Sequence, residues 1–128
     1  DLLAATAAAG TRLAVVGGAG SLYVSEGGPR LIDTSEFPDA YKPEASAALE
    51  TLLAMEASSV GDWFYVSPAA LYGSFAPGTR TGNYRLGGNV LVTDAEGKSV
   101  IGGEDYAIAF VDEIEKKAHH NQRFTVGY

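Results

Sequence analysis

The sequence predicts an α/β fold of three layers, in which helices cover both faces of a mainly parallel sheet. Two observations support this prediction. Arg12–Gly17 is an almost continuous apolar run, as expected for a parallel strand buried on both faces. Asp62–Ser67 is rich in aromatic and β-branched residues, which favours a second buried strand. Segments of helical composition alternate with these runs, and that alternation is typical of α/β proteins.

Three helices and a last strand follow from local patterns. The Ala-rich segment Asp1–Ala9 is closed by Gly10, a residue type that commonly ends helices. Pro43–Ser58 has proline in its first turn and leucines at helical spacing. Glu104–Lys117 is amphipathic, and its acidic start and basic end suit the helix dipole. Gln122–Val126 is predicted to be a terminal edge strand.

Two long loops and a small hairpin are predicted between these elements. Gly18–Asp39 is an irregular connection, and loops of that length are usually functional. Pro68 cannot donate to a central ladder, so the second strand ends there and Ala69–Thr81 is a loop at its C-terminal end. Gly82–Leu86 and Val90–Thr93 flank a Gly-Gly-Asn turn, which predicts a hairpin of two short strands.

Length, charge and composition narrow the classes of function. The 128 residues predict a single domain, 1–128, with no internal boundary. A net charge of −7 argues against a nucleic-acid partner, because binding to phosphates needs clustered Lys and Arg. The lack of cysteine excludes disulfides and thiolate metal sites, and it fits a cytoplasmic location. The apolar runs are too short for a membrane span, so no membrane partner is expected.

The segment Thr11–Val24 looks like a dinucleotide-binding fingerprint but lacks its third glycine. In G-x-G-x-x-G, the third glycine allows a helix to pack closely on the strand. Counted from Gly18, that position is Tyr23, and the residues that follow are typical of a loop. We therefore predict a strand, a tight turn and a long loop. The glycines indicate a close approach to the backbone where a parallel strand ends, and α/β sheets bind ligands at such ends.

Five sequence strings together resemble one family: VVGGAGSL, SPAAL, RTGNYRLGG, GEDYA and HHNQRFTVGY. The family is the atypical short-chain dehydrogenase/reductase group, the small NAD(P)-binding proteins described as NmrA-like or NADH-flavin-reductase-like. The resemblance covers essentially the whole chain, but only the C-terminal, substrate-side half of such a protein. It implies half of a Rossmann-like, doubly wound sheet, from which the N-terminal glycine-rich half is absent.

The resemblance also implies a cofactor site at the mouths of the two central strands. Gly18, Ala19 and Gly20 would lie near the nicotinamide ribose. Ser21 would be the catalytic hydroxyl, which polarises a substrate carbonyl or holds a ribose oxygen. The alternative for Ser21 is a turn serine that bonds its own backbone. The implied cofactor is NADP or NAD, although this chain alone is expected to bind a dinucleotide poorly.

A second segment is implicated by the same resemblance. Pro68, Ala69 and Ala70 match the family segment that lies along the nicotinamide through backbone atoms; alternatively, Pro68 only ends the strand. The Y-x-x-x-K catalytic pair of the wider superfamily does not occur. Tyr41 and Lys42 are adjacent and are predicted to be helix-entry residues, because neighbouring side chains do not converge. The proton donor therefore stays open between Ser21, another tyrosine and water.

Charged residues near the last helix suggest no further site. His119 and His120 are adjacent and lack a third ligand at suitable spacing, so a solvated helix end is predicted and no metal site. Glu113 belongs to a charged helix face that is expected to be solvated.

Two functions remain as hypotheses. The first is the substrate-side portion of an NAD(P)H-dependent oxidoreductase, which reduces a small carbonyl, quinone or flavin-like acceptor and is inactive alone. The second is a non-catalytic α/β module that self-associates and keeps a vestigial small-ligand pocket. Both leave Arg12–Gly17 as an unpaired sheet edge. Such an edge is a template for pairing, so we expect a homo-oligomer or pairing with the missing N-terminal half.

Overall fold

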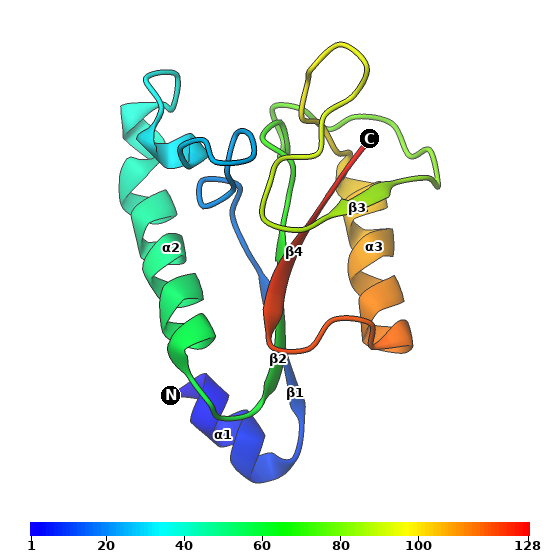
Figure 1. Cartoon of the computed structure of the whole chain (residues 1–128). Helices are drawn as coiled ribbons and strands as arrows, with labels where there is room; N and C mark the ends of the chain where they lie inside the picture. Colours follow the sequence, from blue (N-terminus) through cyan, green and yellow to red (C-terminus); the bar gives the residue numbers. More distant parts are fainter.

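One open sheet of four strands carries helices on both faces (Figure 1). The computed structural model describes residues 1–128. The helices are α1 (Leu2–Ala9), α2 (Lys42–Ala57) and α3 (Gly103–Lys116), and the strands are β1 (Arg12–Val16), β2 (Asp62–Ser67), β3 (Arg85–Gly87) and β4 (Gln122–Gly127). Two 3-10 turns, Leu31–Asp33 and Asp39–Tyr41, lie between β1 and α2. None of the α-helices combines the length and hydropathy needed to cross a membrane.

The sheet has the strand order β1-β2-β4-β3, with the first three strands parallel and β3 antiparallel to β4. The chain passes from β1 to β2, continues to β3 at the far edge and then returns to β4 between them; α2 connects β1 to β2, and α3 lies between β3 and β4. α2 covers one face of the sheet and α3 covers the other (Figure 1). The arrangement is the predicted three-layer, Rossmann-like α/β fold.

Alternate residues of β2 point into two separate cores. Phe64 and Val66 pack beneath α3 in a cluster of eight buried side chains. Trp63 and Tyr65 pack on the other face, beneath α2. A strand sends successive side chains to opposite faces, so β2 is buried on both, as its composition predicts.

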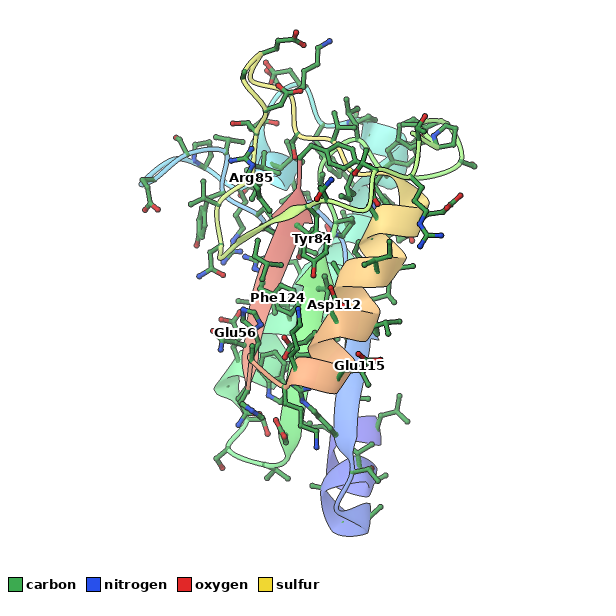
Figure 2. The ribbon with its side chains drawn as sticks, turned by 90° about the vertical axis from the view of Figure 1, so that its right-hand side faces the viewer. Glu56, Tyr84, Arg85, Asp112, Glu115 and Phe124 are labelled. Atoms are coloured by element: carbon green, nitrogen blue, oxygen red, sulfur yellow. The ribbon has the colours of Figure 1, made fainter.

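β4 is an interior strand, and its predicted place at the terminal edge is wrong. β3 pairs with its outer side and sets Leu86 opposite Val126. The hydroxyl of Tyr84, just before β3, donates a hydrogen bond to Asp112 of α3, and the two side chains face each other (Figure 2). Burial and this hydrogen bond raise the pKa of Tyr84 to about 12. A strand of three residues is too short for its pairing with a distant strand to be predicted from the sequence.

The predicted hairpin is not formed. Residues 90–93 form no strand, and Val90 instead makes a bridge to Tyr23 in the loop after β1. A Cβ atom at Gly87 would lie 2.6 Å from Val92 Cγ2, and one at Gly127 would lie 3.1 Å from the same side chain. These glycines make room for Val92, so residues 90–93 return beside β3 and β4 without forming a strand.

β1 forms one edge of the sheet and pairs only with β2. The strand is less buried than its apolar sequence predicts, since Val16 is 64% exposed and Ala14 is also exposed. The reason is that no residue of β1 belongs to the core beneath α3. The outer side of β1 has no partner within the chain, as expected for an unpaired edge.

A buried carboxylate fastens the loop after β2 to α3 and to the C-terminus. Asp105, in the first turn of α3, accepts hydrogen bonds from the backbone nitrogens of Thr81 (3.0 Å) and Gly82 (2.9 Å) and from the Tyr128 hydroxyl. Burial alone would raise the pKa of Asp105, but these hydrogen bonds outweigh it and lower the pKa to about 2. The negative charge also suits the N-terminus of a helix.

Asp105 is expected to make the fold sensitive to acid. Its folded pKa lies below the ordinary value of 3.8, so its stabilisation is present above that value and is lost as the pH falls to about 2. We expect Asp105→Asn to lower the free energy of unfolding at neutral pH by roughly 2 kcal/mol and to weaken its dependence on acid. Urea unfolding at neutral and acidic pH measures both. Glu104→Gln, at an exposed neighbouring carboxylate, is the control, and equal acid sensitivity in both variants would contradict the prediction.

Candidate functional site

The C-terminal ends of β1 and β2 lie side by side, with Val16 paired to Val66. The segments that leave these ends, residues 17–21 and 68–70, contain all the site residues predicted from the sequence. Parallel α/β sheets bind ligands at this edge, outside the carboxyl ends of their strands. The structure therefore brings the two predicted segments to one edge of the sheet.

The first glycine after β1 is required by packing within the protein. A Cβ atom at Gly17 would lie 1.9 Å from Cε1 of Tyr65, so the tyrosine ring occupies the space that a side chain would need. The hydroxyl of Tyr65 in turn accepts a long hydrogen bond, of 3.4 Å, from the backbone nitrogen of Gly18. The close approach indicated by the sequence is thus, at Gly17, the approach of an aromatic ring and not of a ligand.

The next three residues, Gly18, Ala19 and Gly20, differ in how closely the rest of the protein packs against them. Gly18 and Ala19 are half-buried, and Gly20 is buried. A Cβ atom at Gly18 would meet only the Cβ of Ala48, at 3.9 Å, whereas one at Gly20 would lie 3.1 Å from the Cβ of Ala45. A side chain at Gly18 would therefore make only ordinary contact with α2, whereas Gly20 is held by tight packing on α2.

The segment after β2 is held from behind by one serine. Pro68 and Ala69 are buried, and Ala70 is half-buried. The backbone nitrogen of Ala70 donates to Oγ of Ser99 at 3.0 Å, and that of Leu71 donates to the Ser99 carbonyl at 2.9 Å. These bonds fix the path of the segment as it leaves the sheet.

Ser21 is held by a buried arginine that the sequence analysis did not single out. Ser21 is 3% exposed, and its Oγ accepts a hydrogen bond of 2.7 Å from Nη1 of Arg123 on β4. The same nitrogen donates to Oγ of Ser67 at 3.1 Å, and Nε of Arg123 donates to Oδ1 of Asn89 at 3.0 Å. Ser21 thus bonds a residue far away in sequence, and the alternative of a hydroxyl bonded to its own backbone is not seen.

Arg123 is a buried cation whose bonded partners are all neutral. It is 5% exposed and forms no ion pair with a carboxylate, although it lies in the field of Glu56. Arg30 donates to the Ser21 carbonyl at 2.6 Å and lies over the ring of Tyr23, with its guanidinium carbon 4.6 Å from the ring centroid. Burial lowers the pKa of Arg123, and the charge of Arg30 contributes in the same direction. Two guanidinium groups therefore give this edge a positive field.

A cavity of about 440 Å³ lies beside this edge, between the loop after β2 and the N-terminus of α3. Its walls come from Tyr72, Gly73, Ser74, Pro77, Gly103 and Glu104. The ring of the nearby Phe75 is 67% exposed. The cavity has mostly uncharged walls, which suits an organic molecule better than an ion.

At the N-terminal ends of the parallel strands, the structure corrects two expectations from the sequence. Glu113 is buried, not solvated, and accepts from Nη2 of Arg12 at 2.7 Å, while its second oxygen bonds Nδ1 of His119 at 2.8 Å. Burial alone would raise the pKa of Glu113, but the hydrogen bonds from His119 and Arg12 lower it. The His119 ring stacks on Phe124, 4.0 Å between centroids, so His119 is not a solvated helix end. Only tertiary contact could reveal this network, because Arg12 is far from the other members in sequence.

The remaining sequence interpretations can be placed simply. As predicted, Tyr41 and Lys42 stand at the entry to α2. Tyr41 is largely exposed, and Lys42 pairs with Asp39 at 3.1 Å. His120 bonds Asp62 at 2.9 Å. No group of three or more acidic or imidazole side chains is arranged to hold a metal ion.

Comparison with known proteins supports an NAD(P)-binding type of fold. No protein-family model matches the chain. The uncharacterized protein YwnB of Bacillus subtilis (strain 168) is 47% identical over 117 residues, which are 91% of this chain and 54% of YwnB. The chain thus spans about half the length of this relative.

Three solved structures share the fold at more than 40% identity. A "putative NADH-flavin reductase" of Streptococcus pneumoniae TIGR4 is 42% identical with a TM-score of 0.83, over 91% of this chain and 55% of that one. A "putative epimerase" of Bacteroides thetaiotaomicron is 44% identical, with a TM-score of 0.85 over 94% and 55%. A "putative exported protein" of Burkholderia pseudomallei is 45% identical, with a TM-score of 0.85 over 96% and 58%. The chain shares the Rossmann-like α/β fold of these structures. Its predicted cytoplasmic location stays a prediction.

The contact between Gly17 and Tyr65 yields a matched pair of variants. We expect Gly17→Ala to lower the free energy of unfolding by roughly 1–3 kcal/mol, because the tyrosine ring must move out of a packed core. Gly18→Ala is expected to be nearly neutral, since the nearest atom to its Cβ is 3.9 Å away. Urea unfolding of the two variants measures the difference. Equal destabilisation would show that the ring does not set the requirement for glycine.

Proposed function

We propose that the chain is the substrate-side portion of an NAD(P)H-dependent oxidoreductase that reduces a small carbonyl, quinone or flavin-like acceptor. The observation that carries this proposal is that Gly18–Ser21 and Pro68–Ala70 lie together at the C-terminal ends of the parallel strands β1 and β2. The buried cation Arg123 lies beside them. The name of the S. pneumoniae protein supports the reaction class. In this proposal the chain corresponds to the C-terminal half of an atypical, NmrA-like short-chain dehydrogenase/reductase.

The placement of these segments supports a nicotinamide site at the C-terminal ends of β1 and β2. Gly18 and the backbone of Pro68–Ala70 leave neighbouring parallel strands at their C-terminal ends. NADPH or NADH, when bound, supplies the hydride. The chain has no G-x-G-x-x-G turn for the pyrophosphate, so we assign it the nicotinamide and substrate side of the site only. For this reason we expect it to be inactive alone.

Ser21 is the residue that we assign to the substrate. Its Oγ accepts a hydrogen bond from Arg123, so its own proton is free to be donated to a carbonyl oxygen. Negative charge develops on that oxygen as a hydride arrives at the carbonyl carbon. The guanidinium of Arg123, held behind Ser21 in a buried position, favours that charge.

A chimera tests the activity and the role of Ser21. The segment of YwnB that aligns with this chain is replaced by these residues, and loss of NADPH or NADH is followed with a quinone, flavin or carbonyl acceptor. We expect turnover, and we expect Ser21→Ala to lower kcat by about a hundredfold. Ser59→Ala, at an exposed serine near the N-terminal end of β2, is the control and should stay within about twofold. A folded chimera without turnover would contradict the proposed function.

A second function is favoured by the edge strand. The exposed side chain of Val16 and the unpaired side of β1 suit a non-catalytic module that self-associates through Arg12–Gly17, with a vestigial small-ligand pocket. We expect the chain alone to be a dimer or larger by light scattering and Val16→Lys to be a monomer, because charge on an edge blocks pairing. Val60→Lys, at an exposed valine outside the strands, is the control. A wild-type monomer would exclude self-association.

A further inference from the structure

The two faces of β1 are covered to different extents. Leu13 and Val15 pack against the core beneath α2, together with Leu3 of α1. Ala14 and Val16 point to the other face of the sheet, and both are exposed. From Leu13 onward the strand is nevertheless apolar on both faces, a composition typical of parallel strands that helices cover on both sides. One face of β1 therefore lacks the cover that its sequence predicts.

The register of the sheet shows where this cover ends. Ala14 pairs with Phe64 and Val16 with Val66, so these four side chains lie on one face of the sheet. Phe64 and Val66 are buried beneath α3, whereas Val16, on the next strand, is 64% exposed. A helix is about 10 Å wide and neighbouring strands are about 4.8 Å apart, so one helix covers about two strands. α3 covers β2 and β4 and leaves β1 open.

The side of α3 that faces β1 is apolar. Asp112 bonds Tyr84 and so marks the side of α3 toward β3, which is at the opposite edge of the sheet from β1. Residues two positions away on a helix are turned by about 200°, so Phe110 and Ile114 lie on the side toward β1. Phe110 packs on Phe64, with 5.3 Å between ring centroids. Ile114 is 48% exposed and has no such cover.

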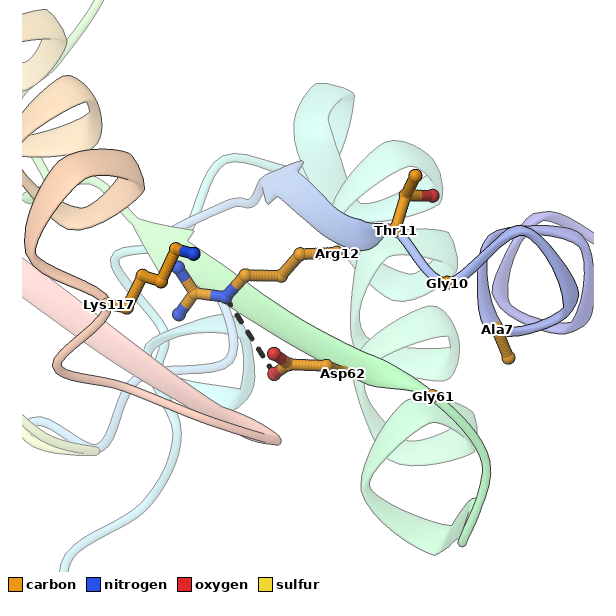
Figure 3. Close-up of a pocket in the computed structure, with 7 residues that line it drawn as sticks. All are labelled: Ala7, Gly10, Thr11, Arg12, Gly61, Asp62 and Lys117. Atoms are coloured by element: carbon orange, nitrogen blue, oxygen red, sulfur yellow. Dashed lines mark ion pairs between the residues drawn. The ribbon is translucent and has the colours of Figure 1, made fainter.

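Arg12 fills the N-terminal end of the same face. Its guanidinium carbon lies 4.4 Å from the centroid of the Phe64 ring. Its Nε atom lies 3.7 Å from Oδ1 of Asp62 (Figure 3), and its Nη2 atom lies 2.7 Å from Oε1 of Glu113. The charge of Arg12 is therefore paired within the chain. The exposed apolar side chains beyond it are named the β1–α3 surface: Ala14, Val16 and Ile114.

The relatives that share this fold contain more chain than the part that matches. This chain spans 54% of YwnB and 55–58% of the three solved structures, whose TM-scores are 0.83 to 0.85. Helices are the elements that cover the faces of parallel sheets. A strand paired with the free edge of β1 would lie in the plane of the sheet, so it would not cover the side chains above that plane. The β1–α3 surface therefore needs a helix.

We propose that the β1–α3 surface binds one amphipathic helix, contributed by the part of a protein such as YwnB that this chain does not span. The apolar side of that helix lies on Ala14, Val16 and Ile114, between α3 and the free edge of β1. This inference rests on the proposed function only in treating the chain as a portion of a longer protein. Its tests measure contact and not turnover, so the two can fail separately.

Thiol labelling tests this contact. The chain has no cysteine, so Ile114→Cys introduces a single thiol. Val60→Cys is the matched control, because Val60 is also 48% exposed and lies outside the helices and strands. We expect N-ethylmaleimide to label both variants at similar rates in the isolated chain. In the YwnB chimera, peptide mass spectrometry should show labelling slowed at least about tenfold in Ile114→Cys and changed less than about twofold in Val60→Cys.

Each other outcome of the labelling contradicts one specific claim. Equal labelling rates for Ile114→Cys in the folded chimera and in the isolated chain would overturn the proposal. Protection in the isolated chain that grows with protein concentration would also overturn it, because a second copy would then cover the surface. A chimera that protects Ile114→Cys but reduces no acceptor would contradict the proposed function alone.

Co-expression is a second test that does not depend on the chimera. A tagged form of this chain is produced together with the remaining part of YwnB as a separate chain, and co-purification is measured. We expect co-purification with the wild-type chain and with Val60→Lys. Ile114→Lys should lower it at least about tenfold, because a charge is costly to bury against an apolar helix. No co-purification with the wild-type chain, or equal co-purification with both variants, would overturn the proposal.

Discussion

The candidate site depends on one buried guanidinium. Arg123 joins β4 to the end of β2 through Ser67, to the loop after β1 through Ser21, and to the segment after β3 through Asn89. A buried charge is costly unless its donors find acceptors, and here all the acceptors are neutral oxygens. The cost is offset only when these separate segments adopt this single arrangement. Arg123 therefore fixes the positions of the residues that any ligand at this edge would meet.

The buried arginines at the two ends of the strands have different kinds of partner. At the N-terminal end, Arg12 meets the buried carboxylate of Glu113, and the pair is completed by His119. At the C-terminal end, Arg123 has no carboxylate and keeps its positive field. A charge that is paired stabilises the fold, whereas an unpaired one in a preorganised setting is free to act on a ligand. For this reason we assign the reactive chemistry to the C-terminal ends of the strands. The charged residues at the N-terminal ends mainly stabilise the packing.

Much of the architecture could be predicted because it depends on local patterns. The bounds of β2 are those predicted from its composition, and the predicted helices at Pro43–Ser58 and Glu104–Lys117 differ from α2 and α3 by one residue at each end. Proline and alternating apolar positions act over a few residues, so they can be read directly. The errors concern pairing over long distances. The position of β4 inside the sheet depends on β3, which is only three residues long and has no pattern of its own.

The sequence by itself determined the fold class, the order of helices and strands, and the edge of the sheet at which Gly18–Ser21 and Pro68–Ala70 lie. It did so because strand period, helix period and chain stops are local properties of neighbouring residues. Only the tertiary structure decided which charges are buried and what they touch. Arg123 beneath Ser21 and Glu113 beside Arg12 meet across different elements. Electrostatic energy depends on distance and burial in space, and neither can be read along the chain.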